Sequence, residues 1–251
     1  MTNKTLFEGQ VCIVVGAGNG IGRATVGLLQ SRGAKVIALD NNVDALGKLK
    51  SEFSLGDDQV SVLDVSDEDQ IKETIARIVA KEKRIDALVN SAGMVGPSNV
   101  KLEDIAWVDF ERTLRVNLFG TIWLTQQVVP IMKAQKYGRI VHVASIAGKE
   151  GNPGMSPYNT SKSGMIGFIK GIGKEIAPDG ITINALAPAV IRTPMNADTS
   201  DETLKYMIAR IPMGRVGEAE EVAETICFMA SRACSFTTGF TFDTTGGRAT
   251  Y

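Results

Sequence analysis

Short apolar runs rich in β-branched residues recur along the chain, with helical patterns between them, and this alternation constrains the fold more than any other feature. Most of the runs are apolar at consecutive positions, which is typical of parallel strands covered on both faces. We expect strands at 11–15, 35–39, 60–63, 85–89, 139–144, 181–186 and 240–243. The pattern predicts an α/β fold, a doubly wound parallel sheet of about seven strands flanked by helices.

The chain shows no linker, low-complexity tract or internal repeat, so we expect one domain over residues 1–251. The segment 189–217 interrupts the alternation with prolines, methionines and a helical stretch near 201–210. A long insertion near the carboxyl ends of parallel strands often covers a substrate. We therefore predict a substrate lid at 189–217.

Composition excludes several classes of function. The formal net charge of -1 gives no basic excess for nucleic acid or for a membrane surface. No apolar run reaches the ~18 residues of a membrane span, and the first residues lack the plan of a signal peptide. Three scattered cysteines are typical of reduced thiols, which favours a cytoplasmic protein. With His142 as the one histidine, we expect no metal site.

A glycine-rich turn follows the first predicted strand and precedes an amphipathic helix. Glycines allow a tight turn and close approach of a pyrophosphate, while the helix N-terminus offers N–H donors. The turn predicts dinucleotide binding in a Rossmann-type sheet, although a tight strand–helix connection alone would also explain it. The candidate cofactor residues in it are Gly16, Asn19, Gly20, Ile21 and Gly22.

Asp40 ends the second predicted strand, where an acidic residue would hold a ribose 2′-hydroxyl. Its carboxylate would repel a 2′-phosphate, and Asn41 and Asn42 supply no compensating cation. We therefore predict NAD rather than NADP. The alternative is that Asp40 only caps the helix that follows.

Tyr158 and Lys162 lie one helical turn apart, with Ser145 upstream at the end of a predicted strand. Positions i and i+4 share one helix face, so the phenol and the ammonium would project into the same space. A nearby cation favours the phenolate and lowers the tyrosine pKa from its ordinary value near ~10. The three residues predict a device that moves a proton to or from a hydroxyl or carbonyl.

Together these motifs resemble the short-chain dehydrogenase/reductase family from end to end. The matching pieces are the glycine turn, Asp64-Val65, Asn90 to Gly93, Asn117, Ser145, Tyr158, Lys162, and Pro188 to Thr193. The resemblance implies an oxidoreductase that transfers hydride between a nicotinamide cofactor and a CH–OH or ketone carbon. It also implies a homotetramer.

The resemblance assigns roles residue by residue. Ser145 would orient the substrate oxygen, Tyr158 would exchange the proton, and Lys162 would bind the nicotinamide ribose and lower the tyrosine pKa. Asn117 would kink its helix and hold a water linked to Lys162. The remaining implied cofactor contacts are Asp64 and Val65 at adenine, Asn90 beside the cofactor, and Ile191 and Thr193 at the carboxamide.

Three positions depart from the family pattern. Val15 stands where threonine is usual, Ser91 where alanine is more usual, and Ala189 where glycine is usual. None of these belongs to the proton-transfer set. His142, on the strand that leads to Ser145, is interpreted as a packed residue with one hydrogen bond rather than as a proton relay.

The sequence constrains the identity of the substrate less than it constrains the reaction. The tail 245–251 and the loop after Ser145 resemble bacterial sugar-acid dehydrogenases, which suggests a 2-keto-3-deoxy sugar acid. Lys149 would then meet a carboxylate and Asn152 a hydroxyl, although Lys149 could equally be a solvated loop cation. The alternatives are a 3-oxoacyl carrier-protein reductase, a non-catalytic NAD-sensing protein, or a sugar-nucleotide epimerase, which usually needs a longer chain. We also predict that Tyr251 reaches a neighbouring subunit, with packing on its own subunit as the alternative.

Overall fold

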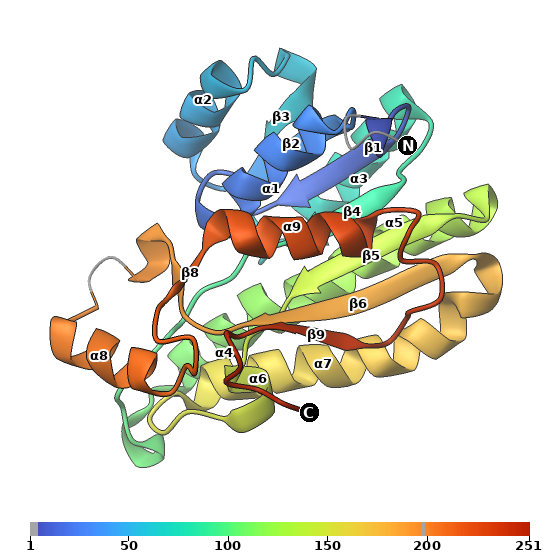
Figure 1. Ribbon diagram of the computed structural model, residues 1–251. Helices are drawn as coiled ribbons and strands as arrows, with labels where there is room; N and C mark the ends of the chain where they lie inside the picture. The colour runs from blue at the N-terminus through green and yellow to red at the C-terminus, as the bar shows by residue number, and fades with distance from the viewer. Residues whose placement is uncertain (1–4, 197–198) are drawn as a thin grey trace.

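The computed structural model describes residues 5–196 and 199–251. Its centre is a seven-stranded sheet in the order β3-β2-β1-β4-β5-β6-β9, in which every neighbouring pair is parallel (Figure 1). The strands are β1 (Val11–Val15), β2 (Lys35–Asp40), β3 (Val60–Val62), β4 (Ala87–Asn90), β5 (Gly138–Val143), β6 (Ile181–Pro188) and β9 (Thr241–Thr244). The predicted doubly wound parallel sheet is confirmed.

The predicted strands are all present, with ends displaced by one or two residues. Two ends are displaced by two residues: β6 continues past 186 to Pro188, and β4 begins two residues after the start of the predicted run 85–89. Ile85 donates its backbone N–H to the Gln135 side chain at 2.9 Å, so the strand ladder begins only at Ala87. A side-chain bond of this kind leaves no trace in hydrophobic periodicity.

Three helices cover each face of the sheet. Helices α1 (Gly20–Ser31), α2 (Val43–Glu52) and α9 (Ala219–Ala230) pack on one face, and α3 (Glu68–Glu82), α5 (Gly120–Gln135) and α7 (Ser156–Ile176) pack on the other. Strands β1, β5 and β6 are buried along their whole length, as consecutive apolar residues predict. Among the described residues, no helix is both long and apolar enough to cross a bilayer.

The connections reverse direction between β1 and β4. The chain moves outward from β1 to β2 and β3, then returns to pair β4 on the other side of β1. In sheets of this type, ligands bind beyond the carboxyl ends of the strands at such a reversal. The topology therefore places a binding site beside the glycine turn after β1.

The expected lid forms a separate layer beyond the carboxyl ends of the strands (Figure 1). It contains β7 (Ile191–Arg192), a 3-10 turn (Pro194–Asn196), α8 (Asp201–Ala209) and β8 (Gly217–Glu218). The helix predicted near 201–210 is confirmed, and the Ser200 side chain caps its first turn. Residues 197 and 198 of the predicted lid lie outside the described residues.

Candidate active site

A cavity of about 660 Å³ opens at the carboxyl edge of the sheet, beside the reversal between β1 and β4. Its volume falls within the range of small-molecule and cofactor sites. Nine of the predicted cofactor residues line it: Gly16, Asn19, Gly20, Ile21, Gly22, Asp40, Asp64, Val65 and Thr193. The fold thus gathers residues from four separate connections around one space.

The glycine turn fits a phosphate because its tightest positions carry no side chain, which leaves the backbone accessible. Gly16 has φ +73°, and an added Cβ there would lie 2.5 Å from the Ala92 nitrogen. At Gly22, a Cβ would lie 1.9 Å from the Gly16 carbonyl oxygen. Helix α1 begins at Gly20, and the side chain of its N-cap, Asn19, makes no capping bond. The first N–H groups of α1 are therefore available to an anionic group.

Ser91 secures this turn from the neighbouring strand. Its hydroxyl donates to the carbonyl oxygens of Val15 at 2.9 Å and Gly16 at 3.2 Å. Ser91, which stands where alanine is more usual, thus supplies a hydroxyl to the backbone of Val15, which stands where threonine is usual.

Asp40 joins the end of β2 to the glycine turn. One carboxylate oxygen accepts from the Gly18 N–H at 2.8 Å, and the other accepts from the Asn42 N–H at 2.9 Å. Helix α2 is capped by Asn42, whose side chain accepts from Ala45 at 3.0 Å. Asp40 is therefore not the helix cap, and its carboxylate borders the cavity where a ribose hydroxyl would lie.

The other predicted cofactor residues differ in their placement. Asp64 folds its own turn by accepting from the Ser66 N–H and hydroxyl at 2.8 Å. Asn90 is buried, donates to the Thr121 hydroxyl at 3.1 Å, and accepts from the Ala92 N–H at 3.1 Å, so it organises the turn after β4. Ile191 is buried and borders a second cavity of about 390 Å³ rather than the first.

Ser145, Tyr158 and Lys162 meet where β5 ends against α7. Lys162 is almost fully buried and donates from Nζ to the Val143 carbonyl oxygen at 2.8 Å. Its Nζ lies 5.7 Å from the centroid of the Tyr158 ring. The Ser145 hydroxyl hydrogen-bonds with the Tyr158 phenol. The structure therefore brings together the three residues that the spacing grouped.

Burial dominates the ionisation of this group. It raises the pKa of Tyr158 above its ordinary value, and the hydrogen bond with Ser145 opposes that rise. Burial also lowers the pKa of Lys162 to about 8. We expected the charge of Lys162 to lower the Tyr158 pKa. In the protein without cofactor the Tyr158 pKa is raised instead, so this expectation is wrong. For the buried Lys162 and the partly buried Tyr158, the loss of hydration of the charged form is the largest influence on the pKa.

Asn117 lies in a π-turn (Arg115–Phe119) between α4 (Trp107–Leu114) and α5, so the predicted helix distortion is present. Its side chain accepts from the Met94 N–H at 2.8 Å and donates to the Met94 carbonyl at 2.9 Å and the Ser161 hydroxyl at 3.0 Å. A Cβ at Gly93 would lie 3.1 Å from Asn117 Oδ1 and 3.5 Å from Lys162 Nζ. Gly93 thus leaves open the space where the amide and the ammonium converge.

His142 is a packed strand residue, with a single bond between its Nε2 and the Thr125 hydroxyl at 2.9 Å. Thr125 already donates its proton to the Thr121 carbonyl at 2.8 Å, so Nε2 must carry the hydrogen and donate. Burial and the charge of Lys162 lower the His142 pKa to about 3. The imidazole is therefore neutral near pH 7 and cannot serve as a base with an ordinary pKa.

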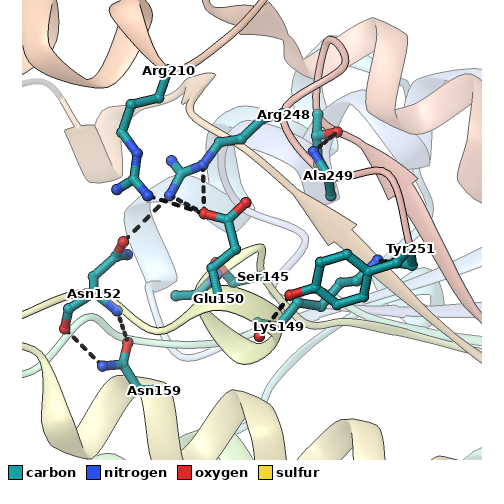
Figure 2. A network of polar contacts seen from close by, with 11 residues as sticks. Ser145, Lys149, Glu150, Asn152, Asn159, Arg210, Arg248, Ala249 and Tyr251 are labelled. Atoms are coloured by element: carbon teal, nitrogen blue, oxygen red, sulfur yellow. Dashed lines mark hydrogen bonds and ion pairs between the residues drawn. The ribbon is translucent and has the colours of Figure 1, made fainter.

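The two predicted substrate residues, Lys149 and Asn152, lie near Ser145, but both have partners within the chain (Figure 2). Lys149 Nζ pairs with Asp243 at 2.7 Å and also donates to the Tyr251 carbonyl oxygen. The Asn159 amide bonds both backbone groups of Asn152, at 3.1 Å and 2.8 Å. The Asn152 side-chain oxygen also accepts from Arg248 at 3.4 Å, so the side chains of both predicted residues have partners.

Reasoning from the sequence missed an ionic cluster on the same loop. Glu150, the last residue of α6 (Ala147–Glu150), pairs with Arg248 from the C-terminal tail at 2.8 Å and with Arg210 from the end of α8 at 3.3 Å (Figure 2). Arg248 and Arg210 lie 98 and 60 positions from Glu150 in the sequence, so no local motif predicts these ion pairs. Within its own chain, the Tyr251 ring centroid is 5.0 Å from Lys149 Nζ, and the reach of this residue to a neighbouring subunit stays a prediction.

Comparisons with known proteins agree with this geometry. The family model described as enoyl-(acyl carrier protein) reductase matches residues 16–248. A 2-dehydro-3-deoxy-L-rhamnonate dehydrogenase (NAD(+)) from Sphingomonas sp. is 41% identical over 98% of this chain and 97% of its own. A 3-oxoacyl-[acyl-carrier-protein] reductase from Thermotoga maritima is 43% identical over 96% and 98%. The crystal structure of levodione reductase superposes with a TM-score of 0.91 at 30% identity, covering 96% of this chain and 98% of that one. The chain therefore belongs to the short-chain dehydrogenase/reductase family of nicotinamide-dependent oxidoreductases.

Proposed function

We propose that this enzyme is an NAD-dependent dehydrogenase that oxidises a secondary hydroxyl of a small sugar acid, such as a 2-keto-3-deoxy-aldonate, or reduces the corresponding ketone. The observation that carries the oxidoreductase chemistry is the convergence of Ser145, Tyr158 and Lys162 at the end of β5. This pair of ionisable groups with a hydroxyl is suited to proton exchange at an alcohol oxygen. The same set argues against a protein that only senses NAD.

In the oxidation, the Ser145 hydroxyl holds the substrate oxygen and Tyr158 accepts its proton. Lys162 is anchored by the Val143 carbonyl and leaves two N–H donors for ribose hydroxyls. The hydrogen bond with Ser145, rather than Lys162, opposes the rise that burial causes in the Tyr158 pKa. The nicotinamide, when bound, accepts or supplies the hydride. Gly93 leaves room between the Asn117 amide and the Lys162 ammonium, because a Cβ there would lie 3.1 Å and 3.5 Å from them.

The choice of NAD rests on Asp40. Its carboxylate borders the cavity at the end of β2 and would accept a hydrogen bond from a ribose 2′-hydroxyl. A 2′-phosphate at that point would meet a negative charge held in place by two backbone N–H groups. The Sphingomonas relative, whose name specifies NAD(+), is consistent with this assignment.

The sugar-acid substrate is supported by similarity and by charge. The Sphingomonas relative acts, by its name, on a deoxy sugar acid. In this chain three cations, Lys149, Arg210 and Arg248, meet two carboxylates, Asp243 and Glu150, at the loop after Ser145. The one cation in excess favours a small anionic substrate.

A 3-oxoacyl carrier-protein reductase is the second candidate, and the identity to the Thermotoga relative favours it. A carrier protein is acidic and needs a basic docking surface, whereas this chain has a net charge of -1. Asp40 also counts against a 2′-phosphorylated cofactor. The two candidates differ in both cofactor and substrate, so one assay separates them.

We further propose a cytoplasmic homotetramer in which residues 1–251 form one catalytic domain. The three cysteines are all unpaired and buried, which is consistent with a reducing compartment. Trp107 and Val108 on α4 and Phe236 near β9 expose large apolar side chains, which favours subunit contacts at these two places.

The test is an absorbance screen at 340 nm with NAD or NADP, supplying sugar acids, neutral polyols and 3-oxoacyl thioesters in the relevant directions. We expect NAD reduction with a sugar acid and no reaction above background in Tyr158→Phe, while that variant still binds NADH. Tyr206→Phe, on the exposed lid helix, is the matched control. NADPH-dependent reduction of thioesters without sugar-acid oxidation would overturn the proposal.

A further inference from the structure

The carboxylate of Glu150 holds two arginines with one oxygen atom. Arg248 donates to Glu150 Oε2 from Nε at 3.0 Å and from Nη2 at 2.8 Å, and Arg210 donates to the same oxygen from Nη2 at 3.3 Å (Figure 2). A single carboxylate neutralises a single guanidinium. The cluster therefore carries one positive charge in excess.

The two arginines are not equivalent. The Arg248 side chain is 6% exposed, makes two bonds to Glu150 and also reaches Asn152 Oδ1 at 3.4 Å. The Arg210 side chain is 37% exposed, and its long contact with Glu150 is its single hydrogen bond within the described part of the chain. A guanidinium has five N–H donors. The excess charge and the spare donors therefore reside on Arg210.

Lys149, the residue assigned to a substrate carboxylate from the sequence, has its charge paired and only one N–H donor left. Its side chain is 10% exposed, it forms a 2.7 Å ion pair with Asp243, and it also donates to Tyr251. To bind a substrate anion, Lys149 would first have to give up a short, half-enclosed ion pair. Arg210 would give up one long hydrogen bond.

Arg210 also has the right place in the fold. It follows directly on α8, the helix of the predicted lid, and contacts α6, which begins two residues after Ser145. Arg210 is thus a cation that the lid helix holds against the loop on which Ser145 lies.

We propose that Arg210 binds the substrate carboxylate and exchanges its contact with Glu150 for a two-point contact with that group. The proposal rests on the proposed sugar-acid function and identifies its specificity-determining residue. Glu150 then has two effects. It positions Arg248, and it competes with the substrate for Arg210. If Glu150 competes with the substrate for Arg210, removal of its charge should lower KM for the acid. A Glu150 that only braces the lid would not have this effect.

The experiment compares a six-carbon 2-keto-3-deoxy sugar acid with its primary amide, which has the same shape without the charge. Arg210→Gln should raise KM for the acid about 10- to 100-fold relative to KM for the amide, since a charged hydrogen bond is lost. Arg210→Lys should keep part of the preference for the acid that Arg210→Gln loses. Lysine restores the positive charge but not the two-point hydrogen bonding of a guanidinium. Lys205→Gln, an exposed cation on the same helix, is the matched control.

Glu150→Gln provides the second arm. It keeps the size and an acceptor oxygen but removes the competing charge, so KM for the acid should fall relative to KM for the amide. If Glu150 and Arg210 only brace the lid, both variants should raise KM for the acid and the amide equally. Thermal melting checks that each variant is folded.

The outcomes separate the two levels of the proposal. If the wild-type enzyme prefers the acid and Arg210→Gln keeps that preference, Arg210 is not the carboxylate ligand and the sugar-acid function stands. If Lys149→Met removes the preference instead, the carboxylate is assigned to Lys149. If the wild-type enzyme oxidises neither compound, the proposed function fails and the role of Arg210 fails with it.

Discussion

The Ser91 hydroxyl donates to the Val15 carbonyl oxygen at 2.9 Å, which ties the end of β4 to the end of β1 where the glycine turn begins. Ser91→Ala should therefore loosen the turn. We expect a loss of about 1 kcal/mol in unfolding free energy and a several-fold weaker NADH affinity, the scale of one neutral hydrogen bond. Urea unfolding and NADH fluorescence titration measure the two effects. Ser163→Ala, which removes an exposed hydroxyl bonded to the Gly148 carbonyl, is the control. Equal losses in both variants would contradict a specific role for Ser91.

Asp40→Ala should raise the use of NADP relative to NAD by about tenfold or more, because the variant removes both an acceptor for the 2′-hydroxyl and a charge that repels a phosphate. The ratio of kcat/KM for the two cofactors is the measurement. Asp64→Ala, which removes another carboxylate from the same cavity, is the control. An unchanged ratio in Asp40→Ala would leave Asp40 with only its structural bond to Gly18.

Lys162→Met should reduce kcat by roughly 100-fold or more and weaken NADH binding at the same time, because one ammonium serves the proton transfer and the ribose. Tyr158→Phe should reduce kcat alone. Stopped-flow binding of NADH separates the two. If Lys162→Met lowers kcat but leaves NADH affinity intact, the ammonium does not contact the ribose.

His142 should make the protein sensitive to acid. Its pKa is about 3 in the folded protein against the ordinary 6.5, so between these values the unfolded chain binds more protons at this residue. The free energy of unfolding should therefore fall as pH falls from 6.5 towards 3, by up to about 1.4 kcal/mol per pH unit. Urea unfolding at several pH values measures it. His142→Gln cannot titrate and can still donate to Thr125, so its curve should be flatter. Parallel curves would contradict the assignment.

Removal of residues 248–251 should raise KM for the substrate several-fold, since Glu150 loses its main partner. Because the tail contacts Lys149 and Glu150 of its own chain, we expect the oligomer to sediment unchanged. A loosened oligomer would instead support the prediction that Tyr251 reaches a neighbouring subunit. Arg248→Gln separates loss of the ion pair from loss of the aromatic terminus.

The sequence predicts most of what depends on local pattern. Apolar runs placed the strands, glycine spacing placed the turn that borders the cavity, and the interval between Tyr158 and Lys162 placed these two side chains together. Contacts between distant segments could not be predicted. The pairing of Lys149 with Asp243 joins residues 94 positions apart, and sequence spacing carries no information on such a meeting. The Tyr158 pKa was misjudged for a similar reason, because burial depends on all the neighbours of a residue and not only on the cation one turn away.

The π-turn at Arg115–Phe119 limits which insertions and deletions this part of the chain can tolerate. One extra residue within a helix rotates everything beyond it by about 100°. Leu124, Val128 and Met132 of α5 meet the sheet with that rotation in place. A deletion that straightened the helix would release Asn117 from its position and also turn this apolar face away from the core. The position of Asn117 and the orientation of the apolar face of α5 are therefore coupled, and a change in one disturbs the other.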